Sequence, residues 1–236
     1  MNGNQLYTIY PLGDTALTID FGNTINESIN DRVLALFHKL QVISSPYILD
    51  VIPAYSSLTI HYNVYAILCK DTEDKTAYNV IVELVQKAIE GEDKLFTYKP
   101  KLIKIPVCYS QKYALDIQEI AEQKGLAISD IIRIHTSKTY KVYMVGFIPG
   151  FAYMGEVDER IAVPRKEEPR TKVTAGSVGI AGKQTGIYPL DSPGGWQIIG
   201  RTPLKLFNKD APNPVLLGAS DEIQFYSISK DEFENY

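Results

Sequence analysis

The sequence predicts a two-domain α+β protein, in which a small two-layer domain precedes an all-β domain. Three observations lead to this prediction. Strand-like and helix-like segments follow one another in the order β-β-α-β-β-α up to residue 90, which is typical of a sheet with helices on one face. A charged segment with a proline, 91–101, interrupts this pattern. Residues 146–200 then hold ten of the 16 glycines and five prolines, which favours short strands joined by turns.

The first domain is assigned to residues 1–92. Its expected elements are, in order, strands at 5–10 and 15–21, a helix over 25–40, strands at 47–54 and 57–63, and a helix over 73–90. Thr24 and Glu27 have the spacing of a capping box at the start of the first helix, and Gly91 is expected to end the second. These elements predict a two-layer, ferredoxin-like domain of one sheet plus helices.

The second domain is assigned to residues 93–236. Its expected elements are, in order, a strand over 101–109, short helices over 114–125 and 128–138, a strand over 139–147, and a closing strand within 215–229. Gly125 is expected to end the first of these helices and Ser129 to cap the second. Because further short strands are expected in between, the domain is predicted to be a barrel or a sandwich.

The composition excludes several classes of protein. The net charge is −4 and the pI is about 5.5, so no overall positive field indicates a nucleic-acid partner. The two cysteines, Cys69 and Cys108, are too few for a disulfide scaffold and suit a reducing compartment. The first residues lack the pattern of a signal peptide, and no apolar run reaches the roughly 18 residues that span a bilayer. We expect a cytoplasmic protein without a membrane partner.

Several common catalytic motifs are absent from the sequence. There is no P-loop, so the chain by itself has no Walker-type ATP site. The three histidines are scattered and the cysteines are unpaired in spacing, so no metal site is expected. The segment 175–179, AGSVG, nearly matches a nucleophile elbow around Ser177. The pattern requires glycine in place of Ala175 and a helix afterwards, and the glycines that follow disfavour that helix.

Three glycine-rich stretches, 146–155, 164–189 and 192–203, combine turn residues with aromatic and polar side chains. Loops on a rigid β-scaffold commonly carry binding sites, and small-molecule sites are mostly apolar with a few oriented polar groups. The stretches offer both kinds of group. The apolar walls are Phe147, Phe151, Tyr153, Tyr188 and Trp196, and the polar groups are Arg170, Lys172, Ser177, Gln184 and Arg201.

Each of these side chains also has a plain structural interpretation, and the residues alone leave both open. Trp196 is a core anchor or stacks on a ligand. Arg165 and Arg170 can be solvated charges beside Glu167 and Glu168, whereas Arg201 is the better candidate to bind an anion through its guanidinium fork. His135 is a hydrogen-bonded residue on a helix face or takes part in proton transfer. Gln184 lies in a turn between glycines, where polar residues often serve solubility alone.

The sequence resembles the KipI family. The stretches GFIPGFAYMG, PRTKVTAGSVGIAGKQTGIYP and SPGGWQIIGRTP carry the resemblance, together with IPVCY and RIHTSKTYKVYMVGF upstream. The likeness covers nearly the whole chain. It implies a small N-terminal α/β domain followed by a cyclophilin-like β-barrel, a fold that does not by itself imply prolyl isomerase activity.

The resemblance further implies a component of a hydrolase that acts on a cyclic amide. Family members include the B subunit of a bacterial ATP-dependent 5-oxoprolinase, which opens 5-oxoproline to glutamate with a paralogous, KipA-like C subunit and a separate A subunit. ATP is then used by the complex, and this chain alone is expected to be inactive. In that setting we expect catalytic roles for His135, Arg201 and Gln184. We expect substrate contacts from Phe147, Pro149, Tyr153, Arg170, Lys172, Ser177, Tyr188 and Trp196.

Two other functions follow from the same family. One is inhibition of a sporulation-type sensor histidine kinase, in which the exposed loops of the barrel dock on the kinase. The other is a carboxylation role in urea or allophanate breakdown. One segment, QKYALD at 111–116, departs from the family pattern because it lacks the expected glycine-rich turn. A contact made at that turn is therefore not transferred to this chain.

Overall fold

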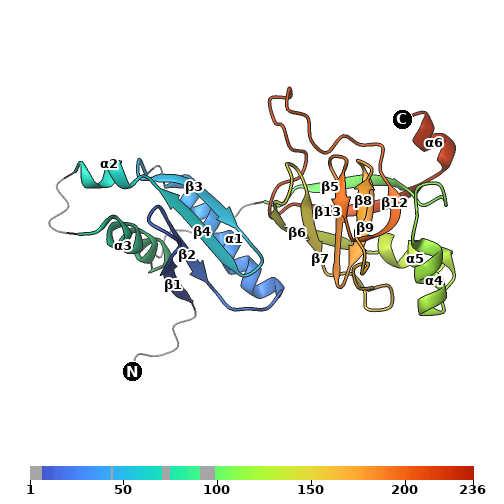
Figure 1. The fold of residues 1–236 in the computed structure, drawn as a ribbon, viewed down its shortest axis with the longest axis horizontal. Coiled ribbons are helices and arrows are strands. Elements are labelled where there is room, and N and C mark those ends of the chain that lie inside the picture. The colour runs from blue at the N-terminus through green and yellow to red at the C-terminus, as the bar shows by residue number, and fades with distance from the viewer. Residues whose placement is uncertain (1–6, 44, 71–74, 91–98) are drawn as a thin grey trace. The chain divides into compact units, whose positions relative to one another are not determined.

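The chain forms two compact units, divided between residues 99 and 100. The structure is a computed structural model, and it describes residues 7–43, 45–70, 75–90 and 99–236 (Figure 1). The predicted domain boundary, between residues 92 and 93, lies outside the described residues, as does the predicted helix end at Gly91. Each unit is described by itself.

The first unit contains a four-stranded antiparallel sheet with the order β1-β2-β4-β3. Its strands are β1 (Thr8–Pro11), β2 (Ala16–Asp20), β3 (Ile48–Pro53) and β4 (Ser57–Tyr62). Alternate residues of β2 and β4 are fully buried, among them Leu17, Ile19, Leu58 and Ile60. The opposite side of these strands carries polar groups, and the hydroxyls of Thr18 and Thr59 lie 3.0 Å apart there. The sheet therefore has one apolar face, as alternation requires.

The helices of this unit are α1 (Glu27–Val42), α2 (Val64–Leu68) and α3 (Ala77–Glu90). Buried residues of α1 and α3 join the apolar face of the sheet in one core. The predicted capping box at Thr24 is wrong, because Asn26 caps α1 by accepting a hydrogen bond from the backbone N–H of Ile29. The short helix α2 has no counterpart among the predicted elements. A sheet with helices is what the sequence indicated, and the finer ferredoxin-like assignment stays a prediction.

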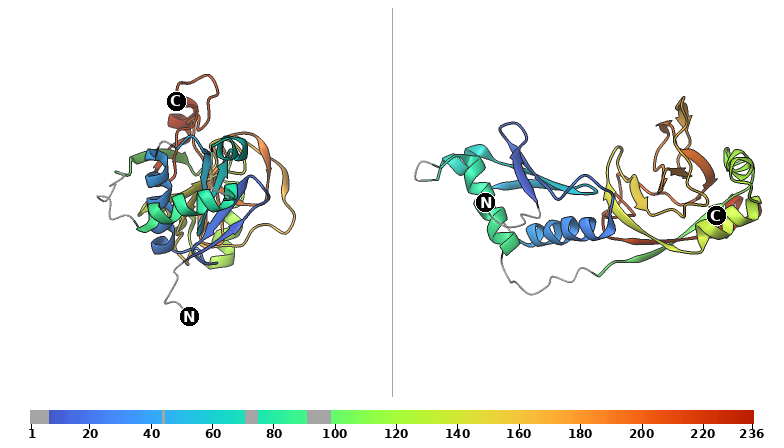
Figure 2. Two further views of the ribbon diagram at one scale, coloured as in Figure 1. Left: turned by 90° about the vertical axis from the view of Figure 1, so that its left-hand side faces the viewer. Right: turned by 90° about the horizontal axis from the view of Figure 1, so that it is seen from below.

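The second unit is built on a closed seven-stranded barrel with the order β10-β7-β6-β13-β5-β12-β9. Its strands are β5 (Leu102–Cys108), β6 (Thr139–Val145), β7 (Ala152–Gly155), β9 (Ser177–Ala181), β10 (Gln184–Ile187), β12 (Gln197–Arg201) and β13 (Glu222–Ile228). β10 pairs with both β7 and β9, which closes the ring. β5 and β13 run side by side in parallel (Figure 2). The other pairs of the barrel are antiparallel. Of the two alternatives from the sequence, the barrel is confirmed.

Three helices and a short ribbon complete the second unit. They are α4 (Ile117–Lys124), α5 (Ile128–Thr136), α6 (Lys230–Glu234), and the strand pair β8 (Arg170–Val173) and β11 (Ser192–Gly194). Buried residues of α4 and α5 belong to the same core as the barrel interior. Gly125 ends α4 with a positive φ, as predicted, but Ser129 is not the cap of α5, which begins one residue earlier. No helix in the described ranges is long and apolar enough to cross a membrane.

Two glycines face outward from the barrel and shape the surface on which the predicted site residues lie. Gly186 of β10 pairs with Gly179 of β9. On its other side Gly186 pairs with Tyr153 of β7, and on its other side Gly179 pairs with Ile198 of β12, so the four residues form one line across the strands. Adjacent residues of these strands, such as Ile180, point into the barrel core. We call the surface of β7, β10, β9 and β12 that carries these glycines the outer face, and the four-residue line the glycine row.

Aromatic rings occupy the space above the glycine row. A Cβ atom at Gly186 would lie 3.0 Å from Trp196 Cζ3, 3.1 Å from Phe151 Cζ and 3.0 Å from the carbonyl oxygen of Ala152. A Cβ atom at Gly179 would lie 3.0 Å from the Cβ of Trp196. The two glycines are therefore required for close packing of rings on the strands, and they are not signs of a slack linker.

We predict that Gly186→Ala destabilises the protein by about 1–2 kcal/mol, because overpacking outweighs the usual gain from restricting the unfolded chain. Gly146→Ala is the matched control, since its Cβ would meet nothing closer than 3.6 Å and it does not need a positive φ. The control should be neutral or slightly stabilising. Urea denaturation of the three proteins measures both effects. Equal shifts for the two variants would show that the glycine row makes no special demand.

Candidate functional site on the outer face of the barrel

An aromatic cluster lies on the glycine row and is centred on Phe151. We define it as the rings that contact Phe151, together with Phe151 itself. Four rings have their centroids 4.7–5.8 Å from the centroid of the Phe151 ring. They are the rings of Tyr153, Tyr188, Trp196 and Phe147. Most of these contacts are edge-to-face, the arrangement that aromatic quadrupoles favour. The residues predicted as walls of the site are thus brought together.

The cluster has a buried base and an exposed rim. Tyr188 and Trp196 are almost fully buried, and they form a small core with Phe151, Val173 and Ile198. This favours the interpretation of Trp196 as a core anchor. The ring of Trp196 is also within range of the Arg165 guanidinium. Phe147, in contrast, is 64% exposed, and Tyr153 is half-buried. A ligand would therefore meet the rim first.

Phe147 is held in a strained turn. Its φ is 71°, in the left-handed region that side chains other than glycine rarely adopt. The backbone N–H of Ile148 donates to the carbonyl of Gly146, so Phe147 is the central residue of a γ-turn with positive φ, which is the rarer and more strained form. The neighbouring Pro149 is exposed. Strain of this kind, on an exposed aromatic residue, is typical of a functional position.

Cations flank the aromatic cluster on the side of the segment 164–170. The guanidinium carbon of Arg165 lies 5.8 Å from the ring centroid of Trp196, within range of a cation–π contact. Burial raises the pKa of the Tyr188 hydroxyl. A hydrogen bond from the backbone of Trp196 and the charges of Arg165 and Arg170 partly oppose that rise. Both guanidinium groups therefore act on the cluster electrostatically.

Asp116 is a buried carboxylate to which no sequence pattern pointed. Its Oδ2 atom accepts a hydrogen bond of 2.6 Å from the backbone N–H of Ile198, and its own N–H donates to the Ile198 carbonyl at 2.8 Å. Its Oδ1 atom accepts from the Lys166 ammonium at 3.2 Å and from the Arg170 guanidinium. The carboxylate thus joins β12 to the segment that carries the cations.

The remaining predicted polar residues do not gather at one point. Arg201 pairs with Ser177 at one end of β9, and Gln184 pairs with Ala181 at the other end. The two ends of β9 are four residue steps apart, or about 13 Å. Lys172 is exposed and forms an ion pair of 2.8 Å with Asp191. The outer face therefore carries these residues, but Gln184 and Arg201 do not share one contact shell.

Arg201 has its own local environment. Its Nε–H donates to the carbonyl of Ala175 at 2.8 Å. Its guanidinium carbon lies 5.9 Å from the ring centroids of both Tyr113 and Phe233. Ser177, its strand partner, is buried. These contacts hold the guanidinium against two aromatic rings of the same unit.

His135 lies inside the barrel, on the other side of the strands from the outer face. It is fully buried, and its ring stacks on Phe225 with the centroids 4.6 Å apart. Thr185 donates its hydroxyl proton to the carbonyl of Gly179, so it accepts from the Nε2–H of His135 at 3.1 Å. The Nδ1 atom then accepts from the hydroxyl of Tyr109 at 2.8 Å. Both ring nitrogens are satisfied by a neutral imidazole, which is the structural alternative that the sequence left open.

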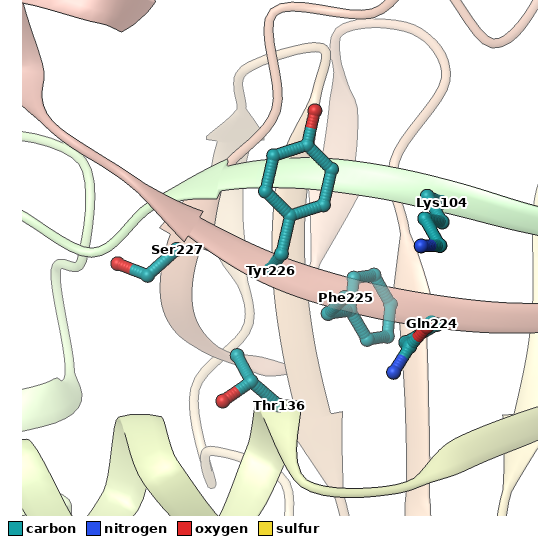
Figure 3. Close-up of a pocket in the computed structure, with 6 residues that line it drawn as sticks. All are labelled: Lys104, Thr136, Gln224, Phe225, Tyr226 and Ser227. Carbon is teal, nitrogen blue, oxygen red and sulfur yellow. The ribbon is translucent and has the colours of Figure 1, made fainter.

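A shallow pocket lies elsewhere on the second unit, along β13 (Figure 3). Its lining residues are Lys104 of β5, Thr136 at the end of α5, and Gln224, Phe225, Tyr226 and Ser227 of β13. None of the predicted site residues lines it. Among the described residues, no group of three or more His, Cys, Asp or Glu side chains could hold a metal ion.

Comparison with known proteins decides the family. The family described as carboxyltransferase domain, subdomain C and D, matches residues 7–217. The chain belongs to this family. It is 39% identical over 231 residues to a Bacillus subtilis (strain 168) protein named as the B subunit of 5-oxoprolinase, covering 98% of this chain and 96% of that protein. A protein of the same name from Escherichia coli O157:H7 is 34% identical and is matched over 92% of this chain and 94% of its own length.

A solved structure shows the same fold in a longer protein. The crystal structure of TTHA0988 matches with a TM-score of 0.77 and 31% sequence identity over 91% of this chain. This chain covers only 40% of that longer chain. The carboxyltransferase-family fold of a closed barrel, helices and a separate sheet is therefore shared with a protein that carries additional structure.

We predict that His135 makes the stability of this family member depend on pH. Burial lowers the pKa of His135 from 6.5 to about 3. Above about pH 6.5 His135 is neutral in both the folded and the unfolded chain, so its titration does not lower the free energy of unfolding. Between pH 6.5 and 3 only the unfolded chain takes up a proton, so the free energy of unfolding falls as the pH falls. Between pH 7.5 and pH 5.5 the free energy of unfolding should fall by about 1.4 kcal/mol on this account. Urea denaturation of wild type and His135→Gln at both pH values isolates the effect, and an equal fall in the two proteins would contradict it.

We also predict that Phe147→Gly is more stable than Phe147→Ala by about 1 kcal/mol, because only glycine adopts a φ of 71° without strain. Both variants lose the ring contact with Phe151, so that loss cancels in the comparison. At an ordinary loop position with negative φ the alanine variant would be the more stable one. Chemical denaturation of the two variants gives the answer, and an alanine variant of equal or higher stability would refute the strained turn.

Proposed function

We propose that this chain is the B subunit of an ATP-dependent 5-oxoprolinase and that it opens 5-oxoproline to glutamate together with partner subunits. The observation that carries the proposal is its end-to-end similarity to proteins that bear this name. The substrate is a five-membered lactam with one carboxylate. Its methylene groups call for an apolar wall, and its carboxylate calls for a cation.

The outer face supplies both kinds of group within one unit. The exposed rim of the aromatic cluster, Phe147 and Tyr153, suits the apolar edge of the ring. Arg165 and Arg170 lie beside the buried base of the cluster, where their charge acts on Tyr188. Substrate contacts from Pro149, Lys172, Ser177, Tyr188 and Trp196 remain part of the proposal, with Tyr188 and Trp196 as the floor of the site.

The proposed catalytic residues are Arg201, Gln184 and His135, and the reaction defines what they would have to do. Hydrolysis breaks the lactam C–N bond, and a water oxygen forms the new bond to the carbonyl carbon. Phosphorylation of the lactam oxygen would make that carbon easier to attack, which gives ATP a role. Arg201 and Gln184 are half-buried on the outer face, and their exposed parts can contact anionic oxygens there. His135 is enclosed in the barrel, so its contacts support a structural role more than proton transfer.

ATP is proposed as a substrate of the complex and not of this chain alone. Among the described residues around the outer face, Lys166 and Arg170 pair with Asp116, Lys172 pairs with Asp191, and Lys183 pairs with Glu159. Lys172 and Lys183 thus each have a carboxylate partner, Lys166 and Arg170 share one, and of Arg170 only one terminal nitrogen is left without a partner. The sequence also has no P-loop. The side chains therefore do not fit a triphosphate, and we assign no phosphate site to them.

The proposed partners are a paralogous, KipA-like C subunit and a separate A subunit. The crystal structure of TTHA0988 supports the proposal that this chain works with partner subunits. In that protein the matching part is 40% of the chain, and the remainder is additional structure that this chain lacks. A cytoplasmic location belongs to the same proposal, since ATP is consumed. Inhibition of a sensor histidine kinase stays an alternative prediction, which kinase autophosphorylation in the presence of excess chain would test.

We predict that glutamate forms from 5-oxoproline only when this chain, both partner subunits and ATP are all present. Each protein is purified, and glutamate release is measured in the full mixture and in mixtures that lack one component. The chain alone should show no activity, because it lacks a site for the triphosphate. A full mixture of folded proteins that forms no glutamate would count against the proposed function.

A further inference from the structure

Asp116 holds two cations in fixed positions relative to the glycine row. Its side chain is only 3% exposed, and three partners surround it from different parts of the chain. Lys166, Arg170 and Ile198 are 50, 54 and 82 residues away in sequence. Because Ile198 is itself a member of the glycine row, the carboxylate is fixed to the same strands that carry the aromatic cluster.

The side chain of Asp116 does not serve the helix that follows it. Asp116 precedes α4, where an aspartate usually accepts a hydrogen bond from the first backbone N–H groups of the helix. Here it makes no such bond. Its oxygens are used by β12 and by the cations instead. Burial alone would lower the pKa of Lys166, but hydrogen bonds to Asp116 and Glu119 raise it, so the ammonium stays charged.

Arg170 is left with an unused donor. One terminal nitrogen of its guanidinium bonds to Asp116, whereas the other, Nη1, is buried and has no hydrogen-bond partner. A buried donor without a partner is costly, and it is usually satisfied by a ligand or by water. Arg170 lies in β8 opposite Gly194, and a Cβ atom at Gly194 would contact the hydroxyl of Tyr188. The free donor is therefore beside the aromatic cluster.

We infer that Asp116 is a positioning residue, which fixes the guanidinium of Arg170 so that its free N–H groups receive the carboxylate of a small anionic ligand on the outer face. The inference rests on the proposed function for the identity of that ligand, 5-oxoproline. Asp116 acts through Arg170 and does not touch the substrate. A guanidinium fork with one edge held by an aspartate presents its other edge in one orientation, which suits the planar carboxylate group.

The test uses the complex with the A and C subunits, in which this chain is wild type, Asp116→Asn or Arg170→Lys. Asp116→Asn removes the charge that holds the guanidinium. Arg170→Lys keeps a cation for Asp116 but removes the fork. The matched control is Asp158→Asn, which removes a half-buried carboxylate paired with Arg160. Circular dichroism and urea denaturation show which variants fold.

We predict that both test variants raise the KM for 5-oxoproline by about tenfold or more, the value of one charged hydrogen bond. The KM for ATP should stay the same, and kcat should change far less. The control should match wild type in all three quantities. A folded Asp116→Asn or Arg170→Lys complex with an unchanged KM for 5-oxoproline would overturn the inference. So would a loss confined to kcat, or an equal rise in both KM values.

A second measurement separates this inference from the proposed function. Trp196 is the only tryptophan, and it lies in the aromatic cluster beside Arg165, so its fluorescence reports on ligands at the outer face. If the wild-type complex does not act on 5-oxoproline, the proposed function fails, and the chain is titrated with acetate. A fluorescence change in wild type that requires at least about tenfold more acetate in Asp116→Asn still supports the inference. Equal titrations, or no change in wild type, overturn it.

Discussion

Trp196 and Phe151 lie against two strands at a point where those strands have no side chains, and the rest of the outer face depends on this contact. Gly179 and Gly186 are paired neighbours, so together they leave one flat area wide enough for both rings. The residues next to them in each strand, such as Ile180 and Ile187, fill the barrel core. The same two strands therefore serve two cores, one on each side, and neither core can shift without the other.

The charged groups are fixed to the same frame. Ile198 pairs with Gly179, and both backbone polar groups of Ile198 bond to Asp116. Asp116 in turn holds Lys166, which lies outside the strands, and Arg170, the first residue of β8. Both cations are thus tied to a strand of the barrel through Asp116, although neither belongs to a barrel strand. Groups held in this way keep their geometry better than groups on a free loop, which is what recognition of a small, rigid ligand requires.

The sequence predicted what depends on local composition and missed what depends on register. Glycine and proline density in 146–200 indicated short strands, and the aromatic residues of these stretches do gather. The choice between barrel and sandwich was open because closure depends on the parallel pairing of β5 with β13, more than 100 residues apart. Asp116 was missed because its partners become neighbours only when β12 is in register. The capping box at Thr24 failed because Asn26, two residues later, offers a competing cap.

The positions of His135 and Phe147 show how the second unit divides its polar chemistry. Inside the barrel, where a charge would be costly, the imidazole is neutral and both nitrogens are used. On the outer face, Phe147 is exposed at a strained φ and Arg170 keeps a donor without a partner. Phe147 and Arg170 thus keep strain and a free donor on the outer face, while both ring nitrogens of His135 in the interior are satisfied. A protein organised in this way is suited to bind and orient a small anion at its surface. The groups that activate water and hold a triphosphate then belong to the partners in the proposed complex.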